Sequence, residues 1–269
     1  YNLMSTMRAG IIVLGPLLAR FGKARVSSPG GCNIGFRPID IHLEALKKMG
    51  VKYKIIDGYI NANAKNGLVG AKIKFPKISV GATENLMIAA CLAKGQTVLS
   101  NCAIEPEIKD LSNFLCSIGA KIVWTGRRQV KIIGIKTFKQ SNYKIMFDRI
   151  EAGTMLIAGA INQGNLKITG IESNILKTEI NLLKKIGAKI NQKKKEIIIK
   201  GNKKIKNINI KTSPYPGVAT DIQAQLMVLL CKANKRSTIK EDIFENRFQS
   251  VPELKRMNAK IEVKGNQAI

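Results

Sequence analysis

The sequence predicts an α/β fold assembled from a repeated unit, and three observations lead to this prediction. A short amphipathic helix that ends in glycine or asparagine and leads into a lysine-bearing strand occurs four times, at intervals of about 70 residues. A nearly all-apolar helix stands between these copies, and short strands follow helices of both kinds. Because helices and strands alternate along the chain, the two must pack against one another in layers.

The four amphipathic copies are predicted to be helices with one buried face. Apolar residues fall three or four positions apart in each copy, which is the spacing of one helical face. The copies occupy residues 43–52, 111–122, 180–190 and 251–261, and their helices end at Gly50, Gly119, Gly187 and Asn258. Glycine and asparagine tolerate the left-handed backbone that closes a helix, so these four residues are predicted C-terminal caps.

The apolar helices are predicted at residues 86–93, 155–161 and 222–231. A helix that is apolar all round must be buried on every side, so these helices should lie innermost. Gly95 and Gly164 are predicted to end two of them, before strands at 96–99 and 165–168, and a linking strand is predicted at 71–75. The openings of the apolar helices, at 81–84, 151–154 and 218–221, suit phosphate binding at a helix N-terminus. Ordinary N-capping explains any one of these openings equally well.

The formal net charge of +27 on 269 residues invites a nucleic-acid-binding interpretation. Lysine outnumbers arginine among the 45 basic residues, however, whereas bidentate recognition of phosphates and bases favours arginine. Aromatic residues make up only 5%, so platforms for base stacking are scarce. No nucleic-acid partner is therefore expected, and the basic field suits the steering of a small anionic substrate. The apolar run at 9–19 is too short to span a bilayer, so no membrane association is expected.

The five cysteines form no C-x-x-C pair, and the chain has one histidine. This pattern indicates neither a zinc site nor a disulfide framework, and a reducing, cytoplasmic setting is the simplest interpretation. Cys91 and Cys231 lie in apolar helical runs and are predicted to be small core residues. His42 begins the face of a helix and is predicted to be structural rather than catalytic.

Residues 28–40 read Ser-Pro-Gly-Gly-Cys-Asn-Ile-Gly-Phe-Arg-Pro-Ile-Asp. Three glycines predict a loop, because glycine permits backbone conformations that other residues avoid. A thiol on such a loop beside a guanidinium suggests a reactive cysteine, Cys32, near an anionic substrate that Arg37 contacts. The alternative from the loop alone is a tight turn around a small buried residue.

Seven motifs in order resemble the family of UDP-N-acetylglucosamine enolpyruvyl transferases, which catalyse the first committed step of peptidoglycan synthesis. The loop around Cys32 resembles the signature loop of that family, and the other matching stretches are residues 6–20, 79–83, 105–108, 148–154, 220–225 and 244–254. The resemblance runs from Tyr1 to about Val263 without large gaps. It departs from the family pattern at Ser5, where a basic residue is usual, and at Phe36, where a small residue is usual.

The resemblance implies an inside-out α/β barrel fold, with two domains of repeated βαβαββ units. The expected domains are residues 1–146, which carry the cysteine loop, and residues 147–269. The family has three units per domain, so the four helix copies found here imply a fragment that lacks both termini. The family's N-terminal lysine–asparagine pair and late arginine would lie outside it, so the fragment alone is expected to be inactive. A monomer is expected.

The resemblance also implies a reaction, in which the enolpyruvyl group of phosphoenolpyruvate moves to the 3′-hydroxyl of UDP-N-acetylglucosamine and phosphate is released. No metal or organic cofactor is implied. Cys32 would be the general acid and the target of the epoxide antibiotic fosfomycin, Asp221 would face the hydroxyl, and Arg37 and Arg247 would hold anionic groups. The implied substrate-binding residues are Arg8, Arg37, Pro38, Ile39, Asp40, Ile41, Lys77, Ile78, Ser79, Val80, Asp221 and Ile243.

Two other interpretations compete with this one. The shikimate-pathway enolpyruvyl transferase shares the implied fold but lacks the Gly-Gly-Cys loop, so Cys32 and the segment from Pro38 to Ile41 count against it. A basic repeat protein that binds nucleic acid is the alternative that is not an enzyme.

Overall fold

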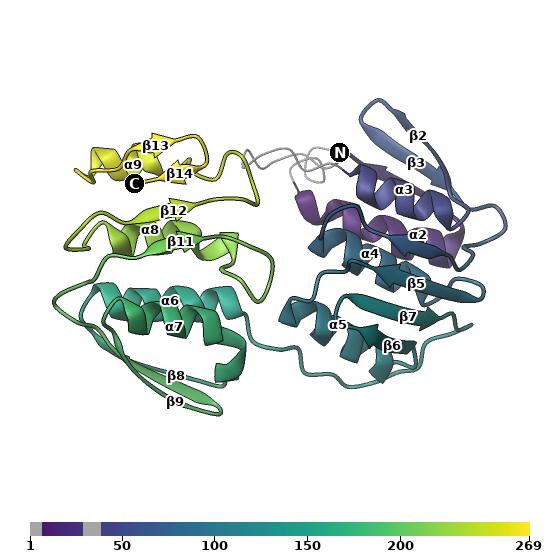
Figure 1. The fold of residues 1–269 in the computed structure, drawn as a ribbon. Helices are drawn as coiled ribbons and strands as arrows, with labels where there is room; N and C mark the ends of the chain where they lie inside the picture. The colour runs from purple at the N-terminus through teal and green to yellow at the C-terminus, as the bar shows by residue number, and fades with distance from the viewer. Residues whose placement is uncertain (1–6, 29–38) are drawn as a thin grey trace. The chain divides into compact units, whose positions relative to one another are not determined.

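The computed structural model describes residues 7–28 and 39–269, and the chain divides into two compact units (Figure 1). The described part of unit 1 ends at Ile145, and unit 2 continues from Met146 to Ile269. Cys32, Arg37 and Pro38, and the departures at Ser5 and Phe36, lie outside the described residues. Among the described residues, no helix is both long and apolar enough to cross a bilayer.

Unit 1 contains two successive copies of the repeat, each with its own open sheet. The first comprises η1 (Arg8–Val13), α2 (Leu14–Phe21), β1 (Lys23–Ser27), α3 (Asp40–Lys48), β2 (Lys52–Ile56) and β3 (Tyr59–Asn63). The second comprises β4 (Lys72–Lys74), α4 (Val80–Ala90), β5 (Gln96–Ser100), α5 (Pro106–Ser117), β6 (Lys121–Gly126) and β7 (Gln129–Ile133). Their strand orders are β1-β3-β2 and β4-β5-β7-β6, and β4 and β5 form a parallel pair in the second sheet.

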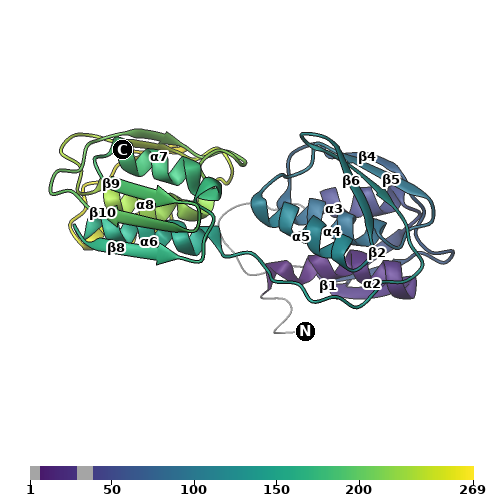
Figure 2. The ribbon, with the colours of Figure 1, turned by 90° about the horizontal axis from the view of Figure 1, so that it is seen from below.

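Unit 2 repeats the same order of elements. Its third copy comprises α6 (Arg149–Ile161), β8 (Asn165–Thr169), η2 (Ser173–Leu176), α7 (Lys177–Lys185), β9 (Lys189–Lys193) and β10 (Glu196–Lys200). Its fourth comprises β11 (Asn209–Lys211), η3 (Thr220–Ile222), α8 (Gln223–Leu230), β12 (Thr238–Lys240), α9 (Val251–Arg256), β13 (Val263–Lys264) and β14 (Gln267–Ala268). The sheet β8-β10-β9 lies over α6, as Figure 2 shows, and the other strand order is β11-β12-β14-β13.

The predicted repeat is confirmed, because α3, α5, α7 and α9 are the four amphipathic copies. The four residues predicted to close them have left-handed backbones, with φ values of 91° at Gly50, 101° at Gly119, 109° at Gly187 and 65° at Asn258. The prediction for Gly164 was wrong in detail. Gln163 has the left-handed backbone after α6, with a φ of 55°. The prediction for Gly95 was also wrong, because α4 ends at Ala90 with Cys91 as its C-cap, and Gly95, with a φ of 87°, directly precedes β5.

The inner position of the apolar helices is confirmed fully for α4 and partly for the other two. No residue of α4 is exposed, and α4 contacts α2, α3 and α5. Met155 of α6 and Val228 of α8 are exposed, so those helices are not buried on every side in this chain. Cys91 is buried as predicted, but Cys231, at the end of α8, is exposed and is not a core residue.

The start of α6 also differs from the prediction. Residues 151–154 lie within the helix, which begins at Arg149. The carboxylate of Asp148 caps it, because its Oδ1 accepts hydrogen bonds from the N–H groups of Ile150 at 2.7 Å and Glu151 at 3.2 Å. Residues 151–154, predicted as a helix opening, therefore lie in the first turns of α6, and Asp148 is the N-cap residue of that helix.

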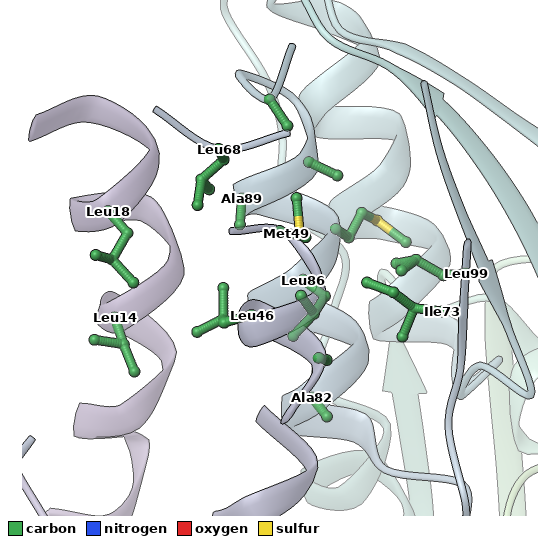
Figure 3. Close-up of a cluster of buried hydrophobic side chains, with 14 of the residues drawn as sticks. Leu14, Leu18, Leu46, Met49, Leu68, Ile73, Ala82, Leu86, Ala89 and Leu99 are labelled. Carbon is green, nitrogen blue, oxygen red and sulfur yellow. The ribbon is translucent and has the colours of Figure 1, made fainter. Parts of the chain in front are cut away.

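Helix packing around α4 forms the core of unit 1. Figure 3 shows Leu14 and Leu18 of α2 pointing toward Leu46 of α3 and Leu86 of α4, and all four side chains are fully buried. Each buried leucine adds about 1.5–3 kcal/mol of hydrophobic stabilisation relative to exposure. This packing holds α2 and α3 against α4.

Gly15 of α2 lies close to Asn85 of α4 in this core. The Gly15 N–H donates to Asn85 Oδ1 at 2.8 Å. A β-carbon at Gly15 would lie 2.7 Å from the Asn85 carbonyl oxygen and would also collide with Oδ1. Glycine is therefore required by space at this position.

We expect Gly15→Ala to lower the free energy of unfolding of unit 1 by about 2–3 kcal/mol, through overpacking and disturbance of a buried hydrogen bond. The fluorescence of Trp124, the single tryptophan of the chain, reports urea unfolding of this unit because it lies in β6. Gly126→Ala is the matched control in the same unit, since its β-carbon would lie at an ordinary contact distance of 3.7 Å from Gln129 Cβ. An equal urea midpoint for wild type and Gly15→Ala would contradict this packing argument.

Candidate active site

The structure describes most, but not all, of the predicted site residues. In unit 1 it places Ile39, Asp40 and Ile41 at the start of α3, and residues 77–80 at the start of α4. In unit 2 it places Asp221 in η3 and Ile243 and Arg247 in the segment that follows β12. For Arg8 it gives the backbone, which begins η1.

The N-termini of α3 and α4 lie side by side in unit 1. Asn85 Nδ2 lies 3.0 Å from Nδ1 of His42, whose ring also lies against Gly81 in the first turn of α4. The predicted substrate-binding segments 39–41 and 77–80, which directly precede His42 and Gly81, therefore lie near each other although they are far apart in the sequence. Both helices direct the positive ends of their dipoles to this region, which favours an anionic group such as a diphosphate.

The opening of α4 is held by two hydroxyl groups. Ser79 Oγ accepts a hydrogen bond from the Ala82 N–H at 3.3 Å, the usual contact of an N-cap. Thr83 Oγ1 donates to the Ser79 carbonyl oxygen at 2.7 Å and accepts from the Ala103 N–H at 3.0 Å. Lys77 is exposed beside this turn. Ordinary N-capping thus explains the hydrogen bond of Ser79. The exposed Lys77 and the N-terminus of α4 lie together at this turn.

His42 and Asn85 form the buried polar centre of this arrangement. Asn85 Nδ2 donates to the Ile11 carbonyl oxygen at 3.2 Å as well as facing His42 Nδ1. Because Asn85 Nδ2 can only donate, His42 Nδ1 accepts and the ring proton is on Nε2. Burial lowers the pKa of His42 to about 4, so the ring is neutral at neutral pH. These contacts agree with the structural role predicted for His42.

Acidic side chains gather where α4 and α5 begin. Burial, with repulsion from Glu107 and Glu105, raises the pKa of Glu84. Pro106 occupies the first turn of α5 and Glu105 is its N-cap residue, without a side-chain capping bond.

Within the described ranges, no three His, Cys, Asp or Glu side chains are placed to hold a metal ion.

In unit 2, Asp221 and Arg247 form an ion pair. Arg247 Nη2 donates to Asp221 Oδ1 at 2.6 Å, and Arg247 Nε donates to the Thr220 carbonyl oxygen at 3.3 Å. The Asp221 side chain is 57% exposed and the Arg247 side chain 19%. An accessible carboxylate oriented by a guanidinium can accept a proton from a hydroxyl group, and the guanidinium can bind an anionic substrate.

The predicted residue Ile243 lies close to this pair. Its N–H donates to Glu241 Oε1 at 2.8 Å, and the other oxygen of Glu241, Oε2, accepts from Thr220 Oγ1 at 2.9 Å. The structure thus brings Asp221, Ile243 and Arg247 together through two residues, Thr220 and Glu241.

The residues missing from the sequence prediction are Asn85, Thr220 and Glu241. Asn85 follows Thr83 and Glu84 in α4, so the local pattern did not mark it as buried, although a buried amide needs hydrogen-bond partners. Glu241 is buried and follows a short strand, but the residue that it contacts lies 21 positions earlier. Nothing in the local pattern around Glu241 indicates that partner.

Sequence comparison places the chain among carboxyvinyltransferases. A family model described as EPSP synthase (3-phosphoshikimate 1-carboxyvinyltransferase) matches residues 1–269. Proteins named UDP-N-acetylglucosamine 1-carboxyvinyltransferase are 70% identical in Pelagibacter ubique, 49% in Trichlorobacter lovleyi and 48% in Rickettsia prowazekii. Each match covers 100% of this chain and 64% of the relative, so the chain spans about two thirds of the length of these relatives.

Solved structures show the same fold. The enolpyruvyl transferase NikO from Streptomyces tendae matches with a TM-score of 0.86 at 22% identity, over 99% of this chain and 64% of NikO. EPSP synthase from Acinetobacter baumannii matches with a TM-score of 0.70 at 18% identity, over 96% of this chain and 62% of the other. The predicted enolpyruvyl transferase fold and the predicted resemblance are both confirmed, and the chain belongs to the EPSP synthase family.

Proposed function

We propose that this chain forms part of an enzyme that transfers the enolpyruvyl group of phosphoenolpyruvate to the 3′-hydroxyl of UDP-N-acetylglucosamine. The observation that carries the proposal is 70% identity, over the whole chain, to the UDP-N-acetylglucosamine 1-carboxyvinyltransferase of Pelagibacter ubique. The proposed setting is the cytoplasm of a bacterium, in peptidoglycan synthesis, with a monomeric enzyme of two domains that meet near residue 146.

The proposed reaction is an addition followed by an elimination. The 3′-oxygen of the sugar bonds to C2 of phosphoenolpyruvate while C3 gains a proton and the hydroxyl loses one. Phosphate then leaves C2 and a proton leaves C3, which restores the double bond in the enol ether. The chemistry needs a proton donor, a base at the hydroxyl and positive charge for the anionic groups.

Residues of both units take part in this proposal. Cys32 is the proton donor to C3, Asp221 is the base at the hydroxyl, and Arg37 and Arg247 bind the anionic groups of phosphoenolpyruvate. The exposed carboxylate of Asp221, paired with Arg247 at 2.6 Å, supports its assignment as an oriented base.

The nucleotide sugar is assigned mainly to unit 1. Arg8, residues 37–41 and residues 77–80 are the proposed contacts, with Asp221 and Ile243 at the sugar. The proximity of the α3 and α4 N-termini supports this assignment, because the positive ends of two helix dipoles lie close together and Lys77 is exposed just before α4.

Alkylation of Cys32 tests the proposed function. The test protein is this chain extended with the segments of the Pelagibacter ubique relative that it does not match, called the extended enzyme below. Fosfomycin should form a thioether at Cys32, in which the Sγ–carbon bond replaces an epoxide carbon–oxygen bond, and UDP-N-acetylglucosamine should change the rate. Peptide mass spectrometry locates the adduct, and the exposed Cys116 is the internal control that should remain unmodified.

The result also separates the competing interpretations. Slow labelling of Cys32 at a rate that is indifferent to UDP-N-acetylglucosamine would reject the proposal. Salt-sensitive binding of random RNA, together with that indifference, would favour a nucleic-acid-binding repeat protein. A dependence on shikimate 3-phosphate in place of the nucleotide sugar would favour the shikimate-pathway transferase.

A further inference from the structure

The segment that follows β12 is fixed firmly to its sheet. The Glu241 N–H donates to the Asn266 carbonyl oxygen at 2.9 Å, and the Asp242 N–H donates to Thr212 Oγ1 at 3.1 Å. Asp242 also pairs with Lys211, with 2.8 Å between Nζ and Oδ2, and accepts from Asn266 Nδ2 at 2.7 Å. The backbone at residues 241 and 242 therefore has a defined position, set by the neighbouring strands.

The side chain of Glu241 holds the backbone of the turn that follows, at Ile243 and Phe244. Glu241 is 3% exposed, and its Oε1 accepts from the Ile243 N–H at 2.8 Å and from the Phe244 N–H at 3.2 Å. Its Oε2 accepts from Thr220 Oγ1 at 2.9 Å. A buried carboxyl group that accepts three hydrogen bonds has a defined position, because a buried polar group that loses a partner is left unsatisfied at a cost in free energy.

Thr220 connects this carboxylate to the ion pair. Its carbonyl oxygen accepts from Arg247 Nε at 3.3 Å, and the next residue, Asp221, pairs with Arg247 Nη2. Neither Thr220 nor Glu241 is among the residues to which the proposed chemistry assigns a role. Together they join the segment that carries Asp221 to the segment that leads to Arg247.

We propose that Glu241 and Thr220 are positioning residues that hold Asp221 and Arg247 in their productive arrangement. This inference rests on the proposed function, in which Asp221 is the base and Arg247 binds an anion. Small displacements of a reacting group can lower turnover by about 100-fold. Loss of the hydrogen bond from Thr220 Oγ1 to Glu241 Oε2 should displace Asp221 slightly, and should therefore lower turnover more than it weakens substrate binding.

The test compares Thr220→Val, which keeps the shape and removes the hydroxyl, with Thr220→Ser, which keeps the hydroxyl. In the extended enzyme, Thr220→Val should lower kcat about 10–100-fold and change KM for UDP-N-acetylglucosamine less than about threefold. Thr220→Ser should stay within about threefold of wild type in both constants.

Thr212→Val is the matched control. It removes the hydroxyl of a buried threonine that bonds the same segment, through the Asp242 N–H, and Thr212 makes no hydrogen bond to Thr220 or Asp221 among the described contacts. If Thr212→Val lowers kcat as much as Thr220→Val does, Glu241 and Thr220 have only a structural role. Equal kcat values for Thr220→Val and Thr220→Ser would also overturn the inference.

Glu241 gives an independent comparison. Glu241→Gln keeps an oxygen for the two backbone N–H groups and offers an amide to Thr220 Oγ1, so it should retain much more activity than Glu241→Ala. Equal kcat values for these two variants, at similar melting temperatures, would count against the inference.

A final readout does not need activity. The Nε–H of Arg247, observed by ¹⁵N NMR, should exchange with water at least about tenfold faster in Thr220→Val than in wild type or Thr212→Val. Absence of phosphate release by the unsubstituted enzyme would refute the proposed function, whereas unchanged Nε–H exchange in Thr220→Val would refute the positioning role.

Discussion

Replacement of Asp221 by asparagine should lower kcat of the extended enzyme by about 10²–10⁴-fold, the usual contribution of a general base. Asparagine keeps the size of the side chain and its hydrogen bond to a sugar hydroxyl, but it cannot take up the proton. KM for UDP-N-acetylglucosamine should therefore change much less than kcat. Steady-state phosphate release at saturating phosphoenolpyruvate measures both constants.

Asp242→Asn is the matched control for this substitution. Asp242 lies in the same unit and also pairs with a cation, Lys211, at 2.8 Å, but it has no role in the proposed chemistry. We expect Asp242→Asn to keep kcat within about threefold of wild type. A comparable loss in the two variants would mean that Asp221 acts through protein stability and not as a base.

Acidification should destabilise unit 1 through His42. The folded state keeps this ring neutral, with its pKa lowered by burial from 6.5 to about 4, whereas the unfolded chain takes up a proton near pH 6.5. The stabilisation is thus present above pH 6.5 and is lost as the pH falls toward 4. From His42 alone, the free energy of unfolding should fall by about 2–3 kcal/mol between pH 7 and pH 4.5.

His42→Gln isolates this contribution, because glutamine does not titrate and can still accept from Asn85. Urea unfolding followed by Trp124 fluorescence at pH 7 and pH 4.5 gives the two losses of stability. The loss should be smaller in the variant by about 2–3 kcal/mol. Glu84, whose raised pKa acts in the opposite direction on acidification, contributes equally to both proteins and cancels. An identical loss in both proteins would contradict the buried, neutral His42.

Features that depend on a few neighbouring residues were predictable from the sequence. Gly50, Gly119, Gly187 and Asn258 closed their helices as predicted, because a left-handed residue is a local requirement. The order of helices and strands followed from hydrophobic periodicity for the same reason. The α/β class and the repeat therefore follow from local patterns in the chain.

Features that depend on contacts between distant segments were not predictable in this way. Asn85 lies between the predicted helix opening at 81–84 and the predicted apolar helix at 86–93 and was not singled out, yet its amide joins η1, α2 and α3. Glu241 lies close to the predicted motif at 244–254, but its hydrogen bond with Thr220 is a tertiary contact that the sequence does not indicate. The exposure of Met155, Val228 and Cys231 likewise reflects which neighbours pack against α6 and α8, which periodicity does not specify.

Phosphate release tests the central claim most directly. The extended enzyme should release phosphate from phosphoenolpyruvate only when UDP-N-acetylglucosamine is present, and mass spectrometry should find one enolpyruvyl ether per phosphate. Cys32→Ser should reduce the rate strongly, since a serine hydroxyl is a much weaker acid than a thiol. Phosphate release that requires shikimate 3-phosphate instead, or no release with either acceptor, would contradict the proposed function.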